Sequence, residues 1–408
     1  MNNGEDIFNE NEGLLEKGFS NELPDIVDDT TVKKNRLSVV KKVRLLTAAI
    51  IILLVAILLF VYGSSLNYDN IRRFFVKVSY NFNTEIAPSG SFEFDESDNM
   101  RYVGYKNGVA VLSGGTLSVF DDRGYLLSSK SAVYKTPMLT TSGKYLISYD
   151  LGGTSLSVHN SFDTVFNYTS DMPITYASMG KGNHLAVCSY AEDHKNKITV
   201  FDTTFSPIFT VYRYDRYVTA AETSPDNKML AVAAVYPSGA EMYGEIILYR
   251  YGESESYATC KLSEEYPHTV FYKKDGTLCA ITEKSVFFID KSGTVLSKYS
   301  FDGKDICCIA NDLRYTAIAV TTAGVGSAEI TVFDSNGNVT ATQKGDIPTE
   351  MTFGNNCLWA LYENGYSSYD LKSGEKKTYP ITERKAILFG KNSVILLTDG
   401  HGEIIVKE

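Results

Sequence analysis

The sequence has few of the residues from which metal centres, disulfide frameworks and nucleophilic sites are built. Its five histidines show no paired spacing such as H-E-x-x-H, and it contains neither a G-x-S-x-G elbow nor a Walker loop. The cysteines show no CxxC pair and no metal-ligand spacing; they are Cys188, Cys260, Cys279, Cys307, Cys308 and Cys357. We therefore expect buried core cysteines, and we assign no catalytic residue, metal ligand or cofactor.

Acidic turns are frequent, but they do not have the pattern of a calcium loop. The segments "DDRG", "DKSG" and "DSNG" lack alternating oxygen ligands followed by a bidentate Glu. A glycine at a left-handed turn position explains them. We interpret these segments as tight turns.

Positive charge is also scarce. The 408-residue chain has a formal net charge of -10, and phosphate binding needs clustered Lys and Arg. This balance argues against a nucleic-acid partner. Residues 81–408 are numerous enough to bury a large core without disulfides or metals.

One long hydrophobic run stands near the N-terminus. Residues 45–62 are uncharged and almost wholly apolar, and no charge follows until Asp69. A bilayer core of ~30 Å needs about 20 helical residues, so we expect a transmembrane helix at 45–65 and a linker at 66–80. The alternative is a cleaved signal peptide with "GSS" at 63–65 as a weak cleavage site, but the long segment before the run disfavours it.

The charges before this run predict its orientation. Six basic residues precede it with no acid among them: Lys33, Lys34, Arg36, Lys41, Lys42 and Arg44. Basic flanks stay in the cytoplasm, so we expect a single-pass cell-membrane protein with residues 1–44 inside and 81–408 outside the cell. Residues 1–32 are acidic and fit a solvated tail. The alternative is a docking motif around "GLLEKGF" for a cytoplasmic partner.

The rest of the chain repeats one short phrase. "AEITVFDSNGNVTAT" at 328–342 has the pattern of a strand, a tight turn and a second strand, and similar phrases start at Thr116, Lys197 and Ser285. A repeat of 36 to 48 residues is typical of a propeller or array. The eight equivalent positions are Val119, Val158, Val200, Leu248, Phe288, Val332, Ser368 and Ile405.

Each repeat contains four strand-like runs, and no helical periodicity competes with them. The last repeat has only three such runs after Arg384. A fourth strand from the N-terminal side would leave no unpaired edge; the candidates are "GSFEFDES" at 90–97 and "KVSYNFNTEI" at 77–86. We expect an all-β, eight-bladed β-propeller closed by an N-terminal strand, with seven blades as the alternative.

The "ITVFD" phrases and "TSPDNKMLAVA" from Thr223, in the position of a turn inside a blade, carry a family resemblance. The chain resembles WD-repeat-like and quinoprotein-like β-propellers, and in particular the membrane-anchored propeller proteins of Gram-positive bacteria grouped as a domain of unknown function. The resemblance implies a propeller over residues ~80 to 408. The Gly-His and Trp-Asp dipeptides of true WD repeats are missing, and Trp359 is the only Trp, which disfavours a quinoprotein-type enzyme.

Loop lengths indicate which face of such a propeller binds. Loops between the second and third strands of a blade, and junctions between blades, emerge on the same face. The long loops at 190–197, 235–245 and 321–328 are of the first kind, and the segments 211–217 and 263–268 are junctions. Interface hot spots are enriched in Tyr and Arg. We expect a binding patch, with packing between blades as the alternative, formed by Tyr190, Tyr212, Arg213, Tyr214, Arg216, Tyr217, Tyr236, Tyr243 and Tyr266.

These patterns favour a non-catalytic cell-surface propeller that binds an envelope protein or a cell-wall glycan. One alternative is a transmembrane coupler that signals to a cytoplasmic partner through its N-terminal tail. Another is an extracytoplasmic hydrolase or lyase with its site in the central channel.

Overall fold

The structure is a computed structural model that describes residues 41–53, 68–82, 90–381, 386–389, 393–398 and 400–406. It divides into two units, Met1–Ile71 and Arg72–Glu408. Residues 41–53 form a helix, and none of the helices in the described ranges is long and apolar enough to cross a bilayer. The acidic tail and the second half of the expected membrane span lie outside the described residues.

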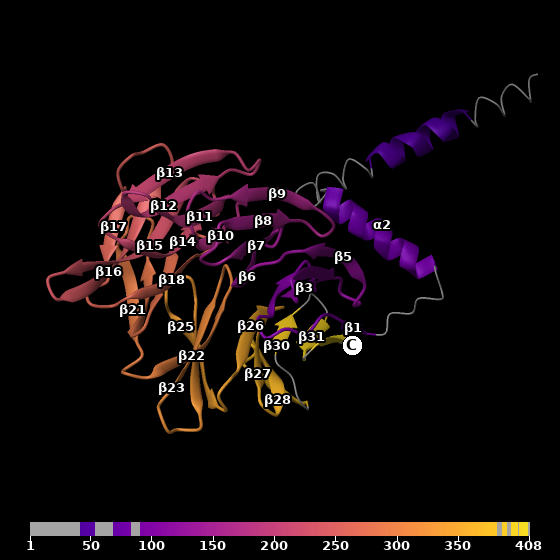
Figure 1. The fold of residues 1–408 in the computed structure, drawn as a ribbon. Helices are drawn as coiled ribbons and strands as arrows, with labels where there is room; N and C mark the ends of the chain where they lie inside the picture. Colours follow the sequence, from indigo (N-terminus) through magenta and orange to yellow (C-terminus); the bar gives the residue numbers. More distant parts are fainter. Residues whose placement is uncertain are drawn as a thin grey trace, which may run out of the picture. The chain divides into compact units, whose positions relative to one another are not determined.

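Eight four-stranded antiparallel sheets follow one another as the blades of a propeller (Figure 1), so the expected all-β, eight-bladed fold is confirmed. We call the strands of each blade a to d from the channel outward. Blades one to four comprise β2 (Arg101–Tyr105), β3 (Gly108–Ser113), β4 (Thr116–Phe120), β5 (Leu126–Ser131), β6 (Pro137–Thr141), β7 (Leu146–Asp150), β8 (Ser155–His159), β9 (Thr164–Thr169), β10 (Ile174–Met179), β11 (Leu185–Ala191), β12 (His194–Phe201), β13 (Pro207–Arg213), β14 (Tyr217–Thr223), β15 (Met229–Ser238), β16 (Glu241–Arg250) and β17 (Ala258–Lys261).

The second half of the ring continues the same order. Blades five to seven comprise β18 (Pro267–Tyr272), β19 (Leu278–Thr282), β20 (Ser285–Ile289), β21 (Val295–Ser300), β22 (Asp305–Asn311), β23 (Thr316–Thr321), β24 (Ala328–Phe333), β25 (Val339–Gly345), β26 (Glu350–Gly354), β27 (Cys357–Tyr362), β28 (Gly365–Asp370) and β29 (Lys376–Pro380). Blade eight contains β30 (Ala386–Phe389), β31 (Ser393–Leu397), β32 (His401–Val406) and β1 (Ser91–Glu93).

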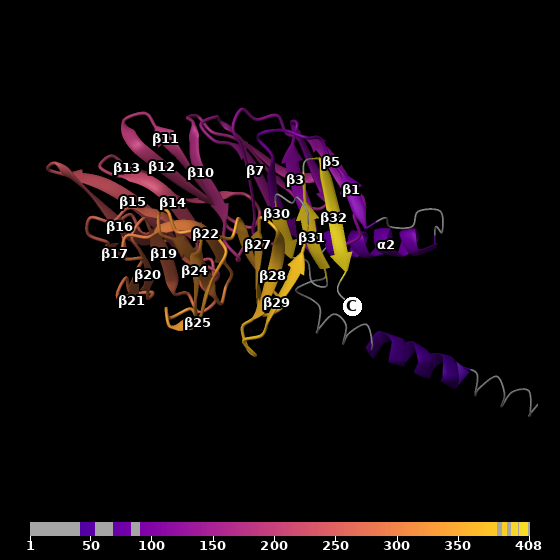
Figure 2. The ribbon, with the colours of Figure 1, turned by 90° about the horizontal axis from the view of Figure 1, so that it is seen from below.

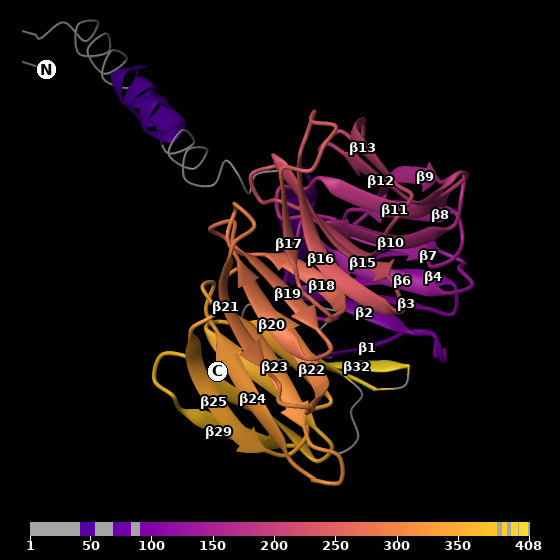
Figure 3. The ribbon, with the colours of Figure 1, turned by 90° about the vertical axis from the view of Figure 1, so that its left-hand side faces the viewer.

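Strand β1 closes the ring as the outer strand of blade eight. It pairs antiparallel with β32, with Ser91 opposite Glu403 and Glu93 opposite His401. Figures 2 and 3 both show this first strand beside the yellow last strand. The Phe92 ring packs on Phe120 of blade one at 4.2 Å between centroids. The closing strand expected at 90–97 is therefore confirmed, and it joins the core between the last and first blades.

The repeated phrase corresponds to strand c and the turn that follows it. All eight aligned positions lie in strands c. In four blades the Asp at the end of this strand accepts the backbone N–H groups two and four residues later at 2.8–3.0 Å; these are Asp121, Asp202, Asp290 and Asp334. In three of these turns a glycine with φ of +83° to +87° follows, whereas blade three uses Phe205 at +64°. These carboxylates therefore stabilise turns.

In the described ranges, no group of three or more His, Cys, Asp or Glu side chains is placed to hold a metal ion. The cysteines there form no disulfide. Cys188, Cys260 and Cys279 are buried, as expected of core residues. Cys307, Cys308 and Cys357 are only half-buried.

Helix α2 (Tyr68–Phe82) occupies most of the stretch expected as a linker. The second strand candidate, residues 77–86, is helical as far as Phe82, so that expectation was wrong there. The segment is held by side chains of blades one and two: Arg72 forms an ion pair with Asp163 at 3.0 Å, and Lys77 forms one with Asp122 at 3.1 Å. The segment that β-favouring residues suggested as a strand is therefore a helix whose basic side chains pair with turns distant in the sequence.

Both carboxylates lie in c-to-d turns. We call the side of the propeller that carries the a-to-b and c-to-d turns the a–b face. The opposite side, with the b-to-c turns and the junctions between blades, is the b–c face. The part of α2 from Arg72 onward contacts the a–b face.

Candidate functional site

The structure brings the nine Tyr and Arg residues together on the b–c face of three neighbouring blades. They lie in the strand ends and loops that join β11 to β12, β13 to β14, β15 to β16 and β17 to β18. Tyr214 is the most exposed, with 71% of its surface accessible. Exposed large side chains also include Tyr190, Tyr212, Tyr217 and Tyr266. Packing between blades therefore does not account for these five.

The β15–β16 hairpin of blade four is the longest on this face, with strands of ten residues each. It projects beyond its neighbours in Figures 1 and 2. Tyr236 and Tyr243 stand opposite each other across the hairpin, with ring centroids 5.9 Å apart. The Tyr243 hydroxyl donates to Glu241 at 2.9 Å. The pair forms a preformed aromatic surface on the hairpin.

The two arginines bond to carboxylates of the protein. Arg216 pairs with Asp215 and with Glu245, a carboxylate that is only 1% exposed. Arg213 contacts Asp215 at 3.3 Å. The Arg216 guanidinium also lies 4.9 Å from the centroid of the Tyr236 ring. These arginines therefore join the blade junction to the hairpin, so the tyrosines form the exposed part of the patch.

Cationic and aromatic contacts continue the patch over blade three. The Lys195 ammonium lies 4.0 Å from the centroid of the Tyr217 ring. The His194 and Tyr212 rings are 5.1 Å apart. His194 and Lys195 stand at the start of β12, and their contacts reach the outer strand of blade three and the first strand of blade four, respectively.

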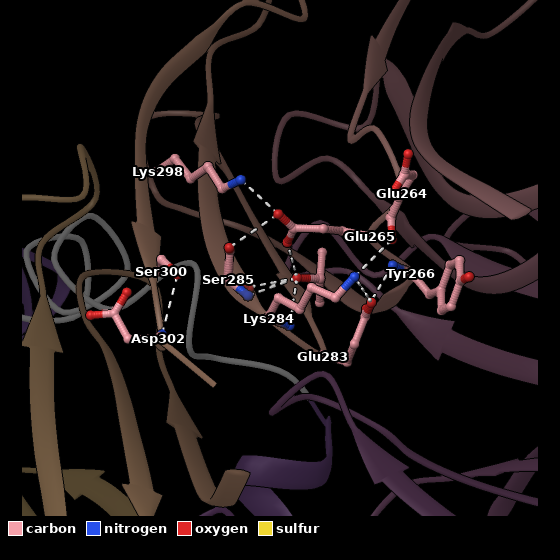
Figure 4. Close-up of polar contacts among 10 residues, drawn as sticks. Glu264, Glu265, Tyr266, Glu283, Lys284, Ser285, Lys298, Ser300 and Asp302 are labelled. Atoms are coloured by element: carbon pink, nitrogen blue, oxygen red, sulfur yellow. Dashed lines mark hydrogen bonds and ion pairs between the residues drawn. The ribbon is translucent and has the colours of Figure 1, made fainter. Parts of the chain in front are cut away.

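At blade five, a buried carboxylate organises the edge of the patch (Figure 4). Glu265 accepts hydrogen bonds from Lys298 at 2.6 Å, from Thr282 at 2.6 Å and from Ser285 at 3.2 Å. Burial by itself raises the pKa of Glu265, but these hydrogen bonds outweigh it and hold the pKa below its usual value. The carboxylate therefore stays charged and ties the junction to strands b, c and d of blade five.

The neighbouring residue, Tyr266, is positioned by its own backbone. Its N–H donates to Glu283 at 2.7 Å, and Lys284 donates to the Glu264 carbonyl at 3.2 Å. Figure 4 shows the Tyr266 ring pointing away from this network. The junction is therefore braced on its inner side and presents the ring outward.

The a–b face has a different kind of candidate site, at the mouth of the central channel. A cavity of about 530 Å³ lies there, lined by the ends of the inner strands of blades two to six. Glu222 accepts the Tyr272 N–H at 3.2 Å, and Lys181 donates to the Ser142 carbonyl at 3.1 Å. Asn311, Asp312 and Arg314 complete the polar lining.

Burial shifts the pKa values of Glu222 and Lys181 toward their neutral forms. It raises the pKa of Glu222 to about 8, despite the Tyr272 N–H and the nearby Lys181 and Lys273 ammoniums. It lowers the pKa of Lys181, although Glu222 and Asp312 oppose the effect. An acid and a base whose pKa values are both shifted toward the neutral form within a cleft are typical of functional sites.

Inspection of the sequence missed these channel residues. Lys181, Glu222 and Lys273 stand at or just after the ends of strands a in three consecutive blades. Lys273 is fully buried, and its ammonium donates to Asn311 and Thr316 at 2.6 Å each. The sequence signal that could have revealed them is a charged residue near the end of the first strand in three successive repeats.

Eight four-stranded blades around a channel, four of them ending strand c with the same Asp turn, define a β-propeller of the WD40-like fold. Within that class, the chain belongs to the family of unknown function DUF5711, which matches residues 81–406. No curated protein sequence matches it.

Solved structures share the fold at low sequence identity. Sqt1 from Chaetomium thermophilum, solved bound to the N-terminus of the ribosomal protein L10, is 14% identical with a TM-score of 0.53 over 77% of this chain and 98% of its own. The C-terminal WD40 domain of Sif2 is 10% identical with a TM-score of 0.53, over 78% and 95% of the two chains. A eukaryotic initiation factor is 14% identical with a TM-score of 0.51, over 74% and 81%.

Proposed function

We propose that this chain is a membrane-anchored, cell-surface propeller that binds an envelope protein on its b–c face. The observation that carries the proposal is the group of exposed tyrosines over blades three to five. Tyrosine rings bury a large area at low cost in side-chain entropy, and their hydroxyls satisfy polar partners. The fold supports this kind of partner, since the Sqt1 propeller was solved with the N-terminus of a ribosomal protein.

The patch is also held together by contacts within the chain. Arg216 links the junction to the hairpin through Glu245, Tyr236 stacks on Tyr243, and Glu265 braces the junction to blade five. Ordering loops on binding costs free energy, so a braced surface retains more of the free energy that its contacts release. This favours recognition of a specific partner over a loose, adaptable contact.

The membrane location is part of the proposal and has separate support. The apolar run at 45–62 is long enough for a span and has a basic N-terminal flank. In the described helix at 41–53, large apolar side chains are exposed, among them Leu45 at 77% and Ile52 at 69%. An exposed apolar helix surface is stable in lipid.

Photo-crosslinking tests the partner directly. A benzoyl-phenylalanine in place of Tyr214, in intact cells, should capture an envelope protein, which is identified by mass spectrometry and then purified. Tyr214→Ala and Tyr243→Ala should each weaken its binding by ~2 kcal/mol, about 30-fold, as expected for hot-spot residues. The matched control is Tyr257→Ala, because Tyr257 is an exposed tyrosine in the c-to-d loop of the same blade, on the opposite face.

Two results would contradict the proposal. Equal affinity for all three variants would remove the case for the b–c face. Capture of wall glycan in place of protein would favour the alternative ligand, since tyrosine rings also stack on sugar rings.

The channel mouth supports a second candidate function, an extracytoplasmic hydrolase or lyase. Burial raises the pKa of Glu222, which favours the protonated form that can donate a proton to a substrate in the cavity, and the Lys181 charge opposes this shift. Purified chain incubated with cell-wall fragments should then release products, and Glu222→Gln should abolish the release. Unchanged turnover in this variant, or no turnover by the wild-type chain, would exclude this assignment.

A further inference from the structure

Helix α2 has a basic side that is bonded to the propeller. Besides the ion pairs of Arg72 and Lys77, Arg73 donates to the Ser161 hydroxyl at 3.1 Å and to the Lys106 carbonyl at 2.9 Å. The Arg72 guanidinium also lies 4.2 Å from the centroid of the Phe162 ring. These contacts reach turns of blades one and two, so they fix how the helix is rotated about its own axis.

The other side of α2 is apolar and uncovered. Phe74 is 63% exposed and Phe75 is 64% exposed, with their ring centroids 5.8 Å apart. Tyr68 and Ile71, earlier in the helix, are exposed as well. Positions three to four residues apart share a helix side, so these four residues form one apolar stripe. Two adjacent phenylalanines left mostly in water are unusual unless something covers them.

The length of the chain before α2 indicates what covers this stripe. The apolar run ends at Tyr62, and the next five residues, "GSSLN", carry no charge before α2 begins at Tyr68. Five extended residues span at most ~18 Å. If the run crosses the bilayer, α2 must therefore start at or near the membrane surface.

We propose that α2 lies in the interfacial layer of the bilayer, with Phe74 and Phe75 inserted among the lipid acyl chains. An amphipathic helix with aromatic residues on one side and basic residues on the other is suited to this position. The ligand of the apolar stripe is then a phospholipid surface. The inference rests on the membrane anchoring proposed above and adds a second, non-spanning contact with lipid.

This contact sets the orientation of the whole propeller. The basic side of α2 is bonded to the a–b face, so embedding the apolar side turns that face toward the membrane. The b–c face then points away from the lipid, with Tyr214 and the β15–β16 hairpin directed outward. A single flexible linker would leave this orientation free.

Tryptophan quenching by brominated lipid tests the inference on the full-length chain. The wild-type chain has one tryptophan, Trp359, which is fully buried in blade seven. The Phe75→Trp variant is reconstituted into phosphatidylcholine vesicles with plain or dibrominated acyl chains. We expect brominated lipid to lower the emission of the added indole at least twofold. The wild-type chain, with its shielded Trp359, should change little.

Tyr214→Trp is the matched control, since it replaces an aromatic residue of similar exposure on the opposite face. It should show no quenching. The far-ultraviolet circular dichroism of each variant, compared with that of the wild-type chain, reports whether it is folded.

Each remaining outcome overturns the inference. If the chain is retained by vesicles but the Phe75→Trp indole is not quenched, the anchor stands and the placement of α2 is wrong. Quenching of the Tyr214→Trp indole would reverse the orientation. A chain that does not associate with vesicles overturns the anchor and this inference together. Partner binding by the b–c face is measured separately with chain in detergent, so its failure is distinguishable from these results.

Discussion

Single residues on the b–c face have two roles, one in holding the surface together and one in exposing aromatic rings. Arg216 illustrates the first role, because it neutralises Glu245, which is almost fully buried. Tyr214 illustrates the second, because its ring is largely in solvent. The sequence shows both as members of the same short segment, "RYDR". Substitutions should therefore separate stability from binding.

Arg216→Ala should lower the free energy of unfolding by about 3 kcal/mol, because it leaves a buried carboxylate without its partner. Tyr214→Ala should change stability by no more than about 0.5 kcal/mol, since its ring is exposed. Thermal melting monitored by circular dichroism compares the two variants with the wild-type chain. A Tyr214 variant that melts as early as the Arg216 variant would place that ring in the structural core of the junction.

Glu222 should make stability depend on pH. Its pKa is raised from the usual 4.5 to about 8 in the folded chain, so the folded state binds the proton more tightly than the unfolded state. The resulting stabilisation is complete below pH 4.5 and is lost as the pH rises through about 8. Glu222→Gln cannot ionise and keeps an oxygen that can accept the Tyr272 N–H. It should exceed the wild-type stability by about 5 kcal/mol above pH 8, the free-energy equivalent of this shift, with no gain near pH 4.

Melting temperatures of both proteins across pH 4 to 9 provide the measurement. A constant difference between them over this range would show that Glu222 titrates normally in the folded chain.

At the scale of elements, the ring depends on one strand contributed from far away in the sequence. Strand β1 has only three paired residues, yet it covers the edge of β32 and inserts Phe92 between blades eight and one. Gly402 leaves room for this ring, because a Cβ there would lie 2.1 Å from the Phe92 Cζ atom. This three-residue strand therefore closes the ring where blade eight meets blade one.

Deletion of residues 90–97 should expose the β32 edge and cause aggregation, because an unpaired strand is a template for other chains. Deletion of residues 1–32 is the control and should leave the propeller folded. Size-exclusion chromatography in detergent and thermal melting distinguish the two. A chain without residues 90–97 that stays monodisperse and melts as cooperatively as the control would show that β1 is dispensable for closure.

At the scale of the whole molecule, the two faces of the propeller have different surroundings. The a–b face carries the contacts of α2 and the mouth of the channel, and the b–c face carries the tyrosines. In the proposed arrangement the first face meets the membrane and the second meets the partner. This division requires residues 81–408 to lie outside the cell.

Protease added to intact, wall-stripped cells should digest the chain after residue 80 and leave an N-terminal tag intact. The reason is the basic flank before the apolar run, which should keep the N-terminus in the cytoplasm. Immunoblotting for the tag and for a C-terminal epitope reads out the result. Loss of the tag with a protected C-terminus would reverse the proposed topology.

The sequence by itself determined the propeller architecture. The eight strand-c positions, the turns that begin at Asp121 or Asp334, and the closing strand all follow from period-two alternation and turn chemistry, which act over a few residues. Loop length indicated the face that carries the tyrosines, but the sequence left open whether their rings are exposed or packed between blades. Patterns within a few residues were therefore enough to predict the strands and turns that recur from blade to blade.

Tertiary structure alone decided the contacts between repeats. Helix α2 is fixed by Asp163, 91 residues after Arg72, and by Asp122, 45 residues after Lys77. Glu222 and Lys181 belong to different blades and meet only where the inner strands converge on the channel. Arg216 has its partner in Glu245, 29 residues away. Such pairs depend on how the closed ring places its blades, and electrostatic attraction between them acts only once burial has brought the charges together.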